Sequence, residues 1–477
     1  MQAEKLHEQM TTTDKPLPLW AHQREALQRA EQASGRYAFH FDPGCGKSRP
    51  VLELFNRSKF NNALIFAPLN VCRNWENEIS KFCKTKNVYI VAGQTKAKKL
   101  KIINEARCDT NARILIANIE SLRSDEYIDA LLPCEFQFII ADEFHNFKSP
   151  KSLQTKGLFR LLVASTPAHF YTLTGTPAPQ GEIDLWTTFY TLGITELPFF
   201  VWRKKYFDDK NAYRKGQRGY FPNFTVRASR KDIFQKQLSS CSSYANKNEV
   251  LDLPELLHTN IYCELAKPQR GHYESMYDLL FARDEDGNEL SASTILARTV
   301  RLQQIVAGFL GNTPIESNRL SALDAAIELT GAPTGSKGPQ FIIWTIFAAT
   351  YWQIAAHLKS LDISFGMLTG EIDASTRHQT IQDFQAGNIR ALIAHPKAGG
   401  VGVNLTAASF SIHYLKDFNL VNDLQCEARN YRAGSEIHKR ITRIDIIAQD
   451  TIDEQISTAL RAKKSVQDFI LGIKNGK

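Results

Sequence analysis

Residues 38–48 read AFHFDPGCGKS, and residues 49–55 continue as RPVLELF. The pattern predicts a short apolar strand, then a turn rich in glycine, and then an amphipathic helix. In this arrangement backbone N–H groups can wrap around phosphate oxygens. Gly44 and Gly46 permit the tight curl, and Cys45 adds an N–H group between them. The stretch therefore predicts a nucleotide-phosphate loop at the end of a strand in an α/β fold.

Two polar residues close this loop. We expect Lys47 to neutralise the β- and γ-phosphates and the Ser48 hydroxyl to face Mg²⁺. The helix that starts here adds the partial positive charge of its N-terminus. The strict phosphate-loop pattern has a glycine where this chain has Phe41, which weakens the match to a general nucleotide hydrolase.

Short apolar runs bounded by turn residues alternate with amphipathic stretches over most of the chain. Runs of this length predict buried parallel strands, and the amphipathic stretches predict crossover helices. A first series of strands is expected at 38–41, 63–67, 88–91, 114–117, 136–141 and 171–173. A second series is expected at 341–345, 364–368, 390–394, 409–415 and 441–448. The predicted fold class is α/β, with two doubly wound parallel-sheet lobes in tandem and short helical insertions.

The two series of strands set the expected domains. We expect the nucleotide-binding lobe over residues 15–225 and the C-terminal lobe over residues 226–477. A helical insertion is expected at 226–335, at the start of the second lobe. The sequence GAPTGSKGP at 331–339 is expected to be a flexible connection into that lobe.

Two adjacent carboxylates end one of the predicted strands. Residues 136–145 read FQFIIADEFH, which places Asp142 and Glu143 at the end of an apolar run. Two acids there are electrostatically costly unless a cation compensates them. We expect Asp142 to hold Mg²⁺ through its water shell and Glu143 to polarise the attacking water. His145 is expected to relay between this site and the cleft between the lobes.

The composition excludes several protein classes. The chain has 477 residues, of which 43% are hydrophobic and 23% charged, so it is neither disordered, collagen-like nor a coiled coil. No apolar run approaches the ~18 residues of a membrane span, and the first ten residues do not resemble a secretory signal. The eight cysteines include no C-x-x-C pair, so neither zinc nor a disulfide framework is expected. We expect a cytoplasmic protein, or one in the host cytoplasm if the source is viral.

One segment carries the excess positive charge. Residues 201–236 contain 11 Lys and Arg against three acids, an excess equal to the net charge of +8 of the whole chain. Eight aromatic residues are interleaved with these cations. The cations attract a polyanion such as nucleic acid, and the aromatic rings either stack on bases or pack the segment onto the protein. The cations expected to contact nucleic acid include Arg214, Lys215 and Arg218.

Several segments resemble those of the superfamily-two helicases. DPGCGKS, ADEFH and TLTGTP (172–177) follow one another as motifs I, II and III do in that superfamily. KAGGVGVNLTAA (397–408) and QCEARNYRAG (425–434) resemble motifs V and VI of its Snf-type (Swi/Snf) DNA translocases. LIFAPLNVCRNWENEISKF (64–82) and ILIANIESLRSD (114–125) resemble motifs Ia and Ib. The resemblance covers about residues 17–460, and it implies two RecA-like lobes.

The resemblance also implies roles for individual residues. Arg429 and Arg432 of motif VI are expected to reach the ATP phosphates from the second lobe, so that hydrolysis requires closure of the lobes. Gln23 is expected to select adenine, and Gly402 to let the backbone approach the nucleotide. The expected contacts to nucleic-acid phosphates are Ser121, Thr174, Thr176, Lys397, Asn404 and Thr406.

The chain departs from the family pattern at a few positions. Trp20 and His22 stand where the family has other residues before the glutamine of its nucleotide motif. Phe144 stands where a small residue is usual in motif II. In motif VI, Ala428 replaces an acid and Tyr431 replaces a histidine.

The expected function is that of a monomeric, ATP- and Mg²⁺-dependent motor on double-stranded DNA. One alternative is a helicase of the same superfamily that separates strands of RNA or DNA. Another is a nucleic-acid-binding scaffold with weak ATPase activity. A phosphate-loop kinase would leave the second lobe unexplained.

Overall fold

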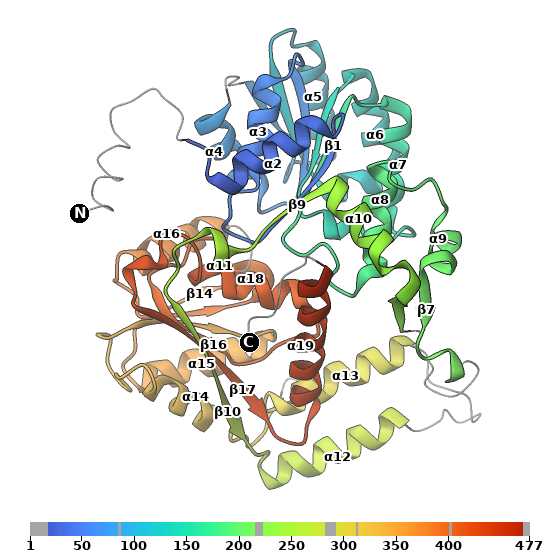
Figure 1. The fold of residues 1–477 in the computed structure, drawn as a ribbon. Helices are drawn as coiled ribbons and strands as arrows, with labels where there is room; N and C mark the ends of the chain where they lie inside the picture. Colours follow the sequence, from blue (N-terminus) through green and yellow to red (C-terminus); the bar gives the residue numbers. More distant parts are fainter. Residues whose placement is uncertain are drawn as a thin grey trace.

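The computed structural model describes residues 18–83, 87–214, 223–281, 292–311, 313–399 and 403–470. The chain folds into two lobes, and Figure 1 shows the first (blue to green) above the second (yellow to red). Each lobe is built on a parallel sheet with helices on both faces. This arrangement confirms the predicted fold class.

The first lobe contains a seven-stranded sheet in the order β3-β4-β2-β5-β6-β1-β9. Its strands are β1 (Arg36–Phe41), β2 (Asn62–Ala67), β3 (Asn87–Ile90), β4 (Arg113–Asn118), β5 (Phe138–Ala141), β6 (His169–Leu173) and β9 (Ser242–Ala245). All neighbouring strands run parallel. The central strands are buried along almost their whole length, because helices cover both faces.

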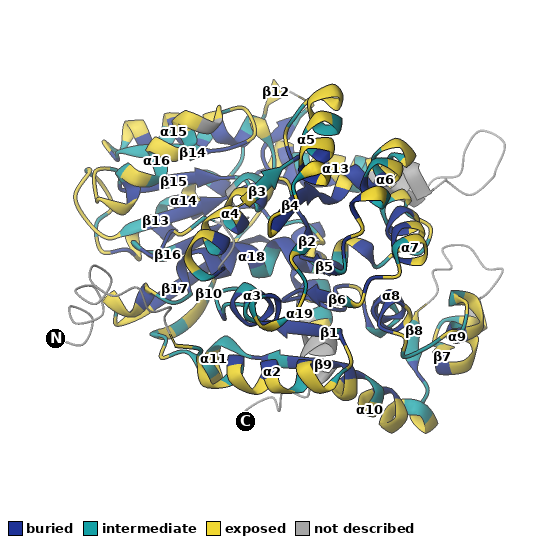
Figure 2. Ribbon diagram, turned by 90° about the horizontal axis from the view of Figure 1, so that it is seen from above, coloured by how far each residue is buried: buried dark blue, intermediate teal, exposed yellow. Residues whose placement is uncertain are grey.

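Alternate residues of each strand of the first lobe enter two separate cores. One core joins Phe39 and Ile65 to helices α2 (Ala21–Gln32), α3 (Ser48–Arg57) and α4 (Cys72–Phe82). The other core joins Leu64 and Phe66 to the helices of the opposite face. These are α5 (Lys96–Cys108), α6 (Asp125–Leu131), α7 (Leu153–Ser165), α8 (Trp186–Thr191), α9 (Phe199–Tyr206) and α10 (Lys231–Cys241). Figure 2 shows the buried strands enclosed by helices whose outer faces are exposed.

The second lobe contains a six-stranded parallel sheet in the order β10-β17-β16-β13-β15-β14. Its strands are β10 (Glu255–Cys263), β13 (Gln340–Trp344), β14 (Phe365–Leu368), β15 (Ala391–Ala394), β16 (Ala408–His413) and β17 (Arg440–Ala448). One face is covered by α14 (Arg319–Glu328) and α15 (Ala348–Ser360), and the other by α16 (Ala374–Gln385) and α18 (Leu420–Asn430). A further core joins α12 (Lys267–Phe281), α13 (Ala292–Val306) and α19 (Ile452–Ile470).

The remaining elements are short. Two antiparallel pairs are formed by β7 (Phe207–Asp209) with β8 (Phe224–Val226) and by β11 (Phe309–Leu310) with β12 (Thr313–Pro314). The short α-helices are α11 (Lys247–Val250) and α17 (Pro396–Gly399). The 3₁₀ helices are η1 (Ile119–Arg123), η2 (Leu132–Cys134), η3 (Phe144–Phe147), η4 (Glu182–Leu185), η5 (Ala212–Arg214), η6 (Ala228–Arg230) and η7 (Ser435–Ile437). In the described ranges, no helix combines the length and apolar character that a bilayer crossing requires.

All eleven predicted strands are present, and two further strands join the sheets. β9 pairs with β1 and therefore completes the sheet of the first lobe, although it lies beyond the expected boundary at residue 225. β10 is an edge strand of the second sheet and pairs with β17. We therefore propose that the lobes divide between β9 and β10.

The glycine-rich loop at 331–339 lies inside the second lobe and does not lead into it, because α14 precedes it and already packs in that lobe. The buried Arg390 guanidinium fastens this loop by donating to the Gly335 carbonyl at 2.7 Å, the Pro339 carbonyl at 3.4 Å and the Thr330 hydroxyl at 3.0 Å. The expectation of a flexible connection was therefore wrong, because the loop carbonyls are bound by a buried cation.

Candidate nucleotide site and nucleic-acid interface

The phosphate loop connects β1 to α3 in the conformation that its glycines permit. Gly44 has a φ of +97° and Gly46 a φ of +67°, a left-handed region that side chains rarely adopt. Ser48 is the first residue of α3, so the loop N–H groups and the helix N-terminus lie together. Lys47 and Ser48 both line the cavity that this loop forms.

Gln23 of α2 supports the loop from outside. Its side-chain amide donates to the Gly46 carbonyl at 3.2 Å, and its amide oxygen accepts from the Trp20 backbone N–H at 2.9 Å. A Cβ atom on Gly46 would lie 2.5 Å from the Gln23 amide nitrogen. Both ends of the Gln23 amide are thus engaged by the protein in this structure. His22, beside it, lies 2.9 Å from the Cys45 carbonyl.

Phe41 explains the departure from the strict phosphate-loop pattern. It is the last residue of β1 and is fully buried. Its ring meets His22 edge-on at 5.3 Å and Phe39 at 5.8 Å. A core side chain therefore occupies this position, and the curl of the loop begins only after it.

Asp142 and Glu143 stand at the end of β5, where the sequence predicts them. Asp142 is buried, and its two oxygens accept from the Glu143 backbone N–H at 2.8 Å and the Trp75 indole N–H at 2.9 Å. Burial, followed by the charge of Glu143, raises the pKa of Asp142. Burial also acts to raise the pKa of Glu143, but Lys47 and other cations outweigh it and lower that pKa. Glu143 has a φ of +47°, a left-handed conformation that residues other than glycine seldom adopt.

His145 links the motif II carboxylate to motif III. Its Nδ1 lies 3.3 Å from Glu143 Oε2, 3.0 Å from Thr174 Oγ1 and 3.3 Å from Thr176 Oγ1. Both threonines are buried. Their hydroxyls contact His145 in this structure, and the expected contact of these threonines with nucleic-acid phosphates stays a prediction.

Two arginines of the second lobe complete the nucleotide site. Arg429 and Arg432 line the same cavity of about 240 Å³ as the phosphate loop, Asp142 and Glu143. The Arg429 guanidinium donates to the carbonyls of Gln425 at 3.0 Å and Val403 at 3.3 Å. Burial, followed by the charge of Arg432, lowers the pKa of Arg429 to about 10. The Nε of Arg432 is buried and has no hydrogen-bond partner in the structure.

The cavity also contains residues that the sequence did not single out. Trp75 of α4 holds Asp142, and Glu78 of the same helix accepts the Ser48 hydroxyl at 2.8 Å. Both residues lie in the segment that resembles motif Ia. Their position in that motif could have indicated a role at the site. The contact between Trp75 of α4 and Asp142 after β5 cannot be predicted from local sequence.

A second, larger space separates the lobes. It has a volume of about 1170 Å³ and is lined by α4 and the residues after β3 on one side and by α16 and the residues around α17 on the other. Asn404 lines this groove, and Lys397 is exposed beside it. Ser121 and Thr406 are buried near the groove. The Ser121 hydroxyl donates to Asn118 Oδ1 at 2.8 Å, and the Thr406 carbonyl lies 2.8 Å from His438 Nε2. Gly402 lies outside the described residues.

The basic segment at 201–236 is held to the first lobe by its aromatic residues. Trp202, Tyr206, Phe207 and Phe234 are buried and contact one another. These rings therefore pack the segment onto the protein, which was one of the two expectations, whereas Tyr213 is exposed. Lys215 and Arg218 lie outside the described residues, as does the side chain of Arg214.

The remaining departures from the family pattern also have structural explanations. Phe144 is buried and packs against Phe147 at 5.2 Å and Phe170 at 6.1 Å. Ala428 is buried in α18. The Tyr431 hydroxyl donates to Asn248 Oδ1 at 2.9 Å, in the segment that connects the lobes.

Comparison with known proteins identifies the family. The SNF2-related domain matches residues 6–308, which is more than half of the chain. The chain belongs to the SNF2-related family. The helicase conserved C-terminal domain matches residues 320–434.

Similar proteins occur in bacteria, a phage and an archaeon. An uncharacterised ATP-dependent helicase of Mycoplasma pneumoniae is 27% identical over 89% of this chain and 39% of its own length. Protein p41 of Acyrthosiphon pisum secondary endosymbiont phage 1 is 25% identical over 90% of this chain and 92% of its own length. The SWI2/SNF2 ATPase core of Sulfolobus solfataricus, solved in complex with double-stranded DNA, is 21% identical over 95% of this chain and 93% of its own, with a TM-score of 0.42. The chain spans about two-fifths of the length of the Mycoplasma helicases that it matches.

Proposed function

We propose that this protein hydrolyses ATP between its two lobes and uses the resulting closure to move along double-stranded DNA. One observation carries the proposal: the phosphate loop, both motif II carboxylates and both motif VI arginines line a single cavity between the lobes. The Arg432 guanidinium enters this cavity with its Nε unpaired. A buried N–H group without a hydrogen bond is costly, and an anionic phosphate would satisfy it.

The residues present fit a magnesium–nucleotide complex. Ser48 and Asp142 offer oxygen atoms at the mouth of the phosphate loop, and Mg²⁺ prefers such ligands together with water and phosphate oxygens. In this structure the Ser48 hydroxyl donates to Glu78, so metal binding requires that it turn. The cation would neutralise the developing charge on the phosphates.

The side chains around this cavity have complementary tasks. Lys47 holds the phosphates, and Glu143 orients the water that attacks them. His145 keeps Glu143 in place through its 3.3 Å contact and connects it to Thr174. Arg429 and Arg432 stabilise the charge of the transition state only when the second lobe meets the first.

The groove between the lobes is the place we propose for the nucleic-acid backbone. Lys397 and Asn404 approach it from the second lobe, and Arg73 and Asn74 from the first. The groove is lined by parts of motifs Ia and V, which lie in different lobes. A change in the distance between the lobes would therefore change the contacts to the nucleic-acid backbone. The basic segment at 201–236 adds long-range attraction to a polyanion.

Phosphate release in four conditions tests this proposal: without nucleic acid, and with duplex DNA, single-stranded DNA or RNA. We expect the highest rate with duplex DNA, and no rate above background for Lys47→Ala in any condition. A highest rate with RNA would contradict the proposed substrate. Release of a strand from tailed duplexes would favour the strand-separating alternative.

A further inference from the structure

The segment that connects the two lobes contains a short helix, α11, between β9 of the first sheet and β10 of the second. Asn246 caps this helix by accepting the Asn248 backbone N–H at 3.0 Å. Figure 1 shows α11 where the chain enters the lower lobe, near α18. The helix therefore lies between the elements that carry the phosphate loop and the arginines.

On one side, α11 is fastened to the phosphate loop. The Lys247 backbone N–H donates to Asp42 Oδ2 at 3.1 Å. Asp42 is the first loop residue after β1, and its backbone N–H donates to the Ala245 carbonyl at 3.0 Å. Its own carbonyl accepts from the Cys45 backbone N–H at 3.1 Å. The start of α11 is thus bound to the residue that shapes the loop.

On the other side, α11 is bound to α18, which contains Arg429 and is followed by Arg432. The Lys247 ammonium donates to Glu427 Oε1 at 2.9 Å, and the two side chains are only 11% and 5% exposed. The same ammonium lies 4.4 Å from the centre of the Tyr431 ring. Asn248 accepts the Tyr431 hydroxyl at 2.9 Å. Glu427 and Tyr431 flank Arg429, and Tyr431 directly precedes Arg432.

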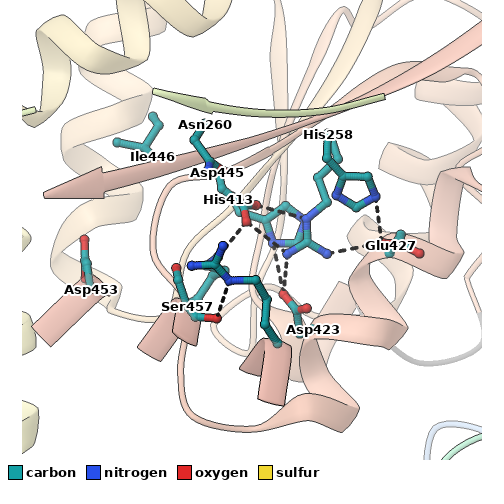
Figure 3. Close-up of polar contacts among 12 residues, drawn as sticks. His258, Asn260, His413, Asp423, Glu427, Asp445, Ile446, Asp453 and Ser457 are labelled. Atoms are coloured by element: carbon teal, nitrogen blue, oxygen red, sulfur yellow. Dashed lines mark hydrogen bonds and ion pairs between the residues drawn. The ribbon is translucent and has the colours of Figure 1, made fainter. Parts of the chain in front are cut away.

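Glu427 is itself held firmly within the second lobe. Its second oxygen is 3.3 Å from the Arg443 guanidinium, which also donates to Asp423 at 2.6 Å and Asp445 at 3.0 Å. Figure 3 shows Asp423, Glu427 and Asp445 around the polar contacts that their carboxylates make with Arg443. Lys416 completes the group through a 2.6 Å contact to Asp445. The end of α18 is therefore a rigid point to which α11 is attached.

The phosphate loop and Arg432 lie close together in this structure. A Cβ atom on Gly44 would lie 3.3 Å from Arg432 Cβ, so the phosphate loop and the Arg432 residue are already in contact. We propose that α11 sets the position of Arg432 relative to the phosphate loop, with Lys247, Asn248 and Tyr431 as positioning residues. The inference rests on the proposed function, since it assumes that Arg432 serves the nucleotide phosphates.

The first test compares Lys247→Met with Lys416→Met. Both lysines belong to the same group of charges and are similarly buried, at 11% and 10% exposure, but Lys247 also lies in α11, where its backbone N–H bonds Asp42 of the first lobe. We expect Lys247→Met to lower kcat for phosphate release on the order of 10- to 100-fold, because small errors in positioning cost that much. Binding of a fluorescent ATP analogue should stay close to that of the parent chain. Lys416→Met should lower kcat much less than Lys247→Met, because the Lys416 ion pair lies within the second lobe. Equal kcat losses in the two variants would overturn the inference, because the effect would then be general destabilisation.

The second test removes single hydrogen-bonding groups, so that folding is preserved. Tyr431→Phe and Asn248→Ala should each lower kcat roughly 2- to 12-fold, the usual range for one hydrogen bond. The double variant should be no slower than the slower single variant, because both changes remove the same contact. Additive losses, or parent-like kcat in both single variants, would refute the role of α11. If the parent chain released no phosphate under any condition, the proposed function would fail and the inference with it. If the parent were active and these variants matched it, only the inference would fail.

Discussion

Replacing Trp75 with phenylalanine tests how Asp142, the proposed Mg²⁺ ligand, is held. Trp75 is 3% exposed, and its indole N–H donates to Asp142 Oδ2 at 2.9 Å. Phenylalanine keeps an aromatic ring in α4 but removes the donor. A hydrogen bond to a charged group contributes about 1.5–3 kcal/mol, so we expect a roughly 10- to 150-fold loss in apparent Mg²⁺ affinity.

The sign of the pH dependence follows from the environment of Asp142. Burial raises its pKa, and the indole hydrogen bond opposes that rise. Without the indole the pKa rises further, so a larger fraction of Asp142 is protonated at a given pH. A protonated carboxyl cannot compensate the cation, and the defect should therefore grow as the pH falls.

The assay is the Mg²⁺ concentration that gives half-maximal phosphate release, measured with saturating duplex DNA below and above neutral pH. Trp186→Phe is the matched control, since Trp186 is 5% exposed in the same lobe and its indole donates to the Leu197 carbonyl at 3.0 Å, away from the site. If both variants needed the same Mg²⁺ concentration as the parent, or if the Trp75 defect did not change with pH, the indole would have no role in metal binding.

Three further predictions concern the nucleotide site and the basic segment. Glu143→Gln should bind a fluorescent ATP analogue normally but hydrolyse ATP very slowly, because it loses only the group that orients the water; normal turnover would remove Glu143 from that role. Arg432→Ala should lower kcat far more than nucleotide affinity, and a nucleotide titration showing the reverse would make Arg432 a binding residue. Neutralising the basic segment should weaken DNA binding about equally across sequences and reduce the salt slope by about 0.9 per lost phosphate contact; an unchanged slope would mean that its cations are merely solvated. The substitutions for that last test are Arg214→Gln, Lys215→Gln and Arg218→Gln.

Most strands of both sheets were predictable because buried parallel strands consist of continuous apolar runs. β9 and β10 were not, since SSYA and ELLHTNIYC lack such runs. Both strands lie at sheet edges, and β10 alternates between exposed and partly buried residues. An edge strand needs apolar residues on fewer sides, so it resembles a loop in sequence. For the same reason the sequence did not indicate the boundary between β9 and β10 that we propose.

The sequence predicted which residues form the nucleotide motifs. It did not predict which contacts these residues make with one another and with neighbouring elements. The sequence identified Lys47, Asp142 and the two arginines, which the structure brings to one cavity. It did not indicate that the Gln23 amide would bond to the phosphate loop, because this contact depends on how α2 packs against β1. The burial of the TGTP threonines beside His145 was not predictable either, because it arises from the pairing of β5 with β6.

The order of strands in the second sheet has a consequence for synthesis of the chain. β10 is its first strand to leave the ribosome and β17 its last, yet β10 joins the sheet only through β17. Pairing between such distant segments forms late and leaves an unpaired edge exposed in the meantime. A chain that stops before Arg440 would therefore lose the sheet positions of two strands, one of which had been translated almost two hundred residues earlier. A stop codon placed before Arg440 should consequently yield aggregated protein and not a shorter folded chain.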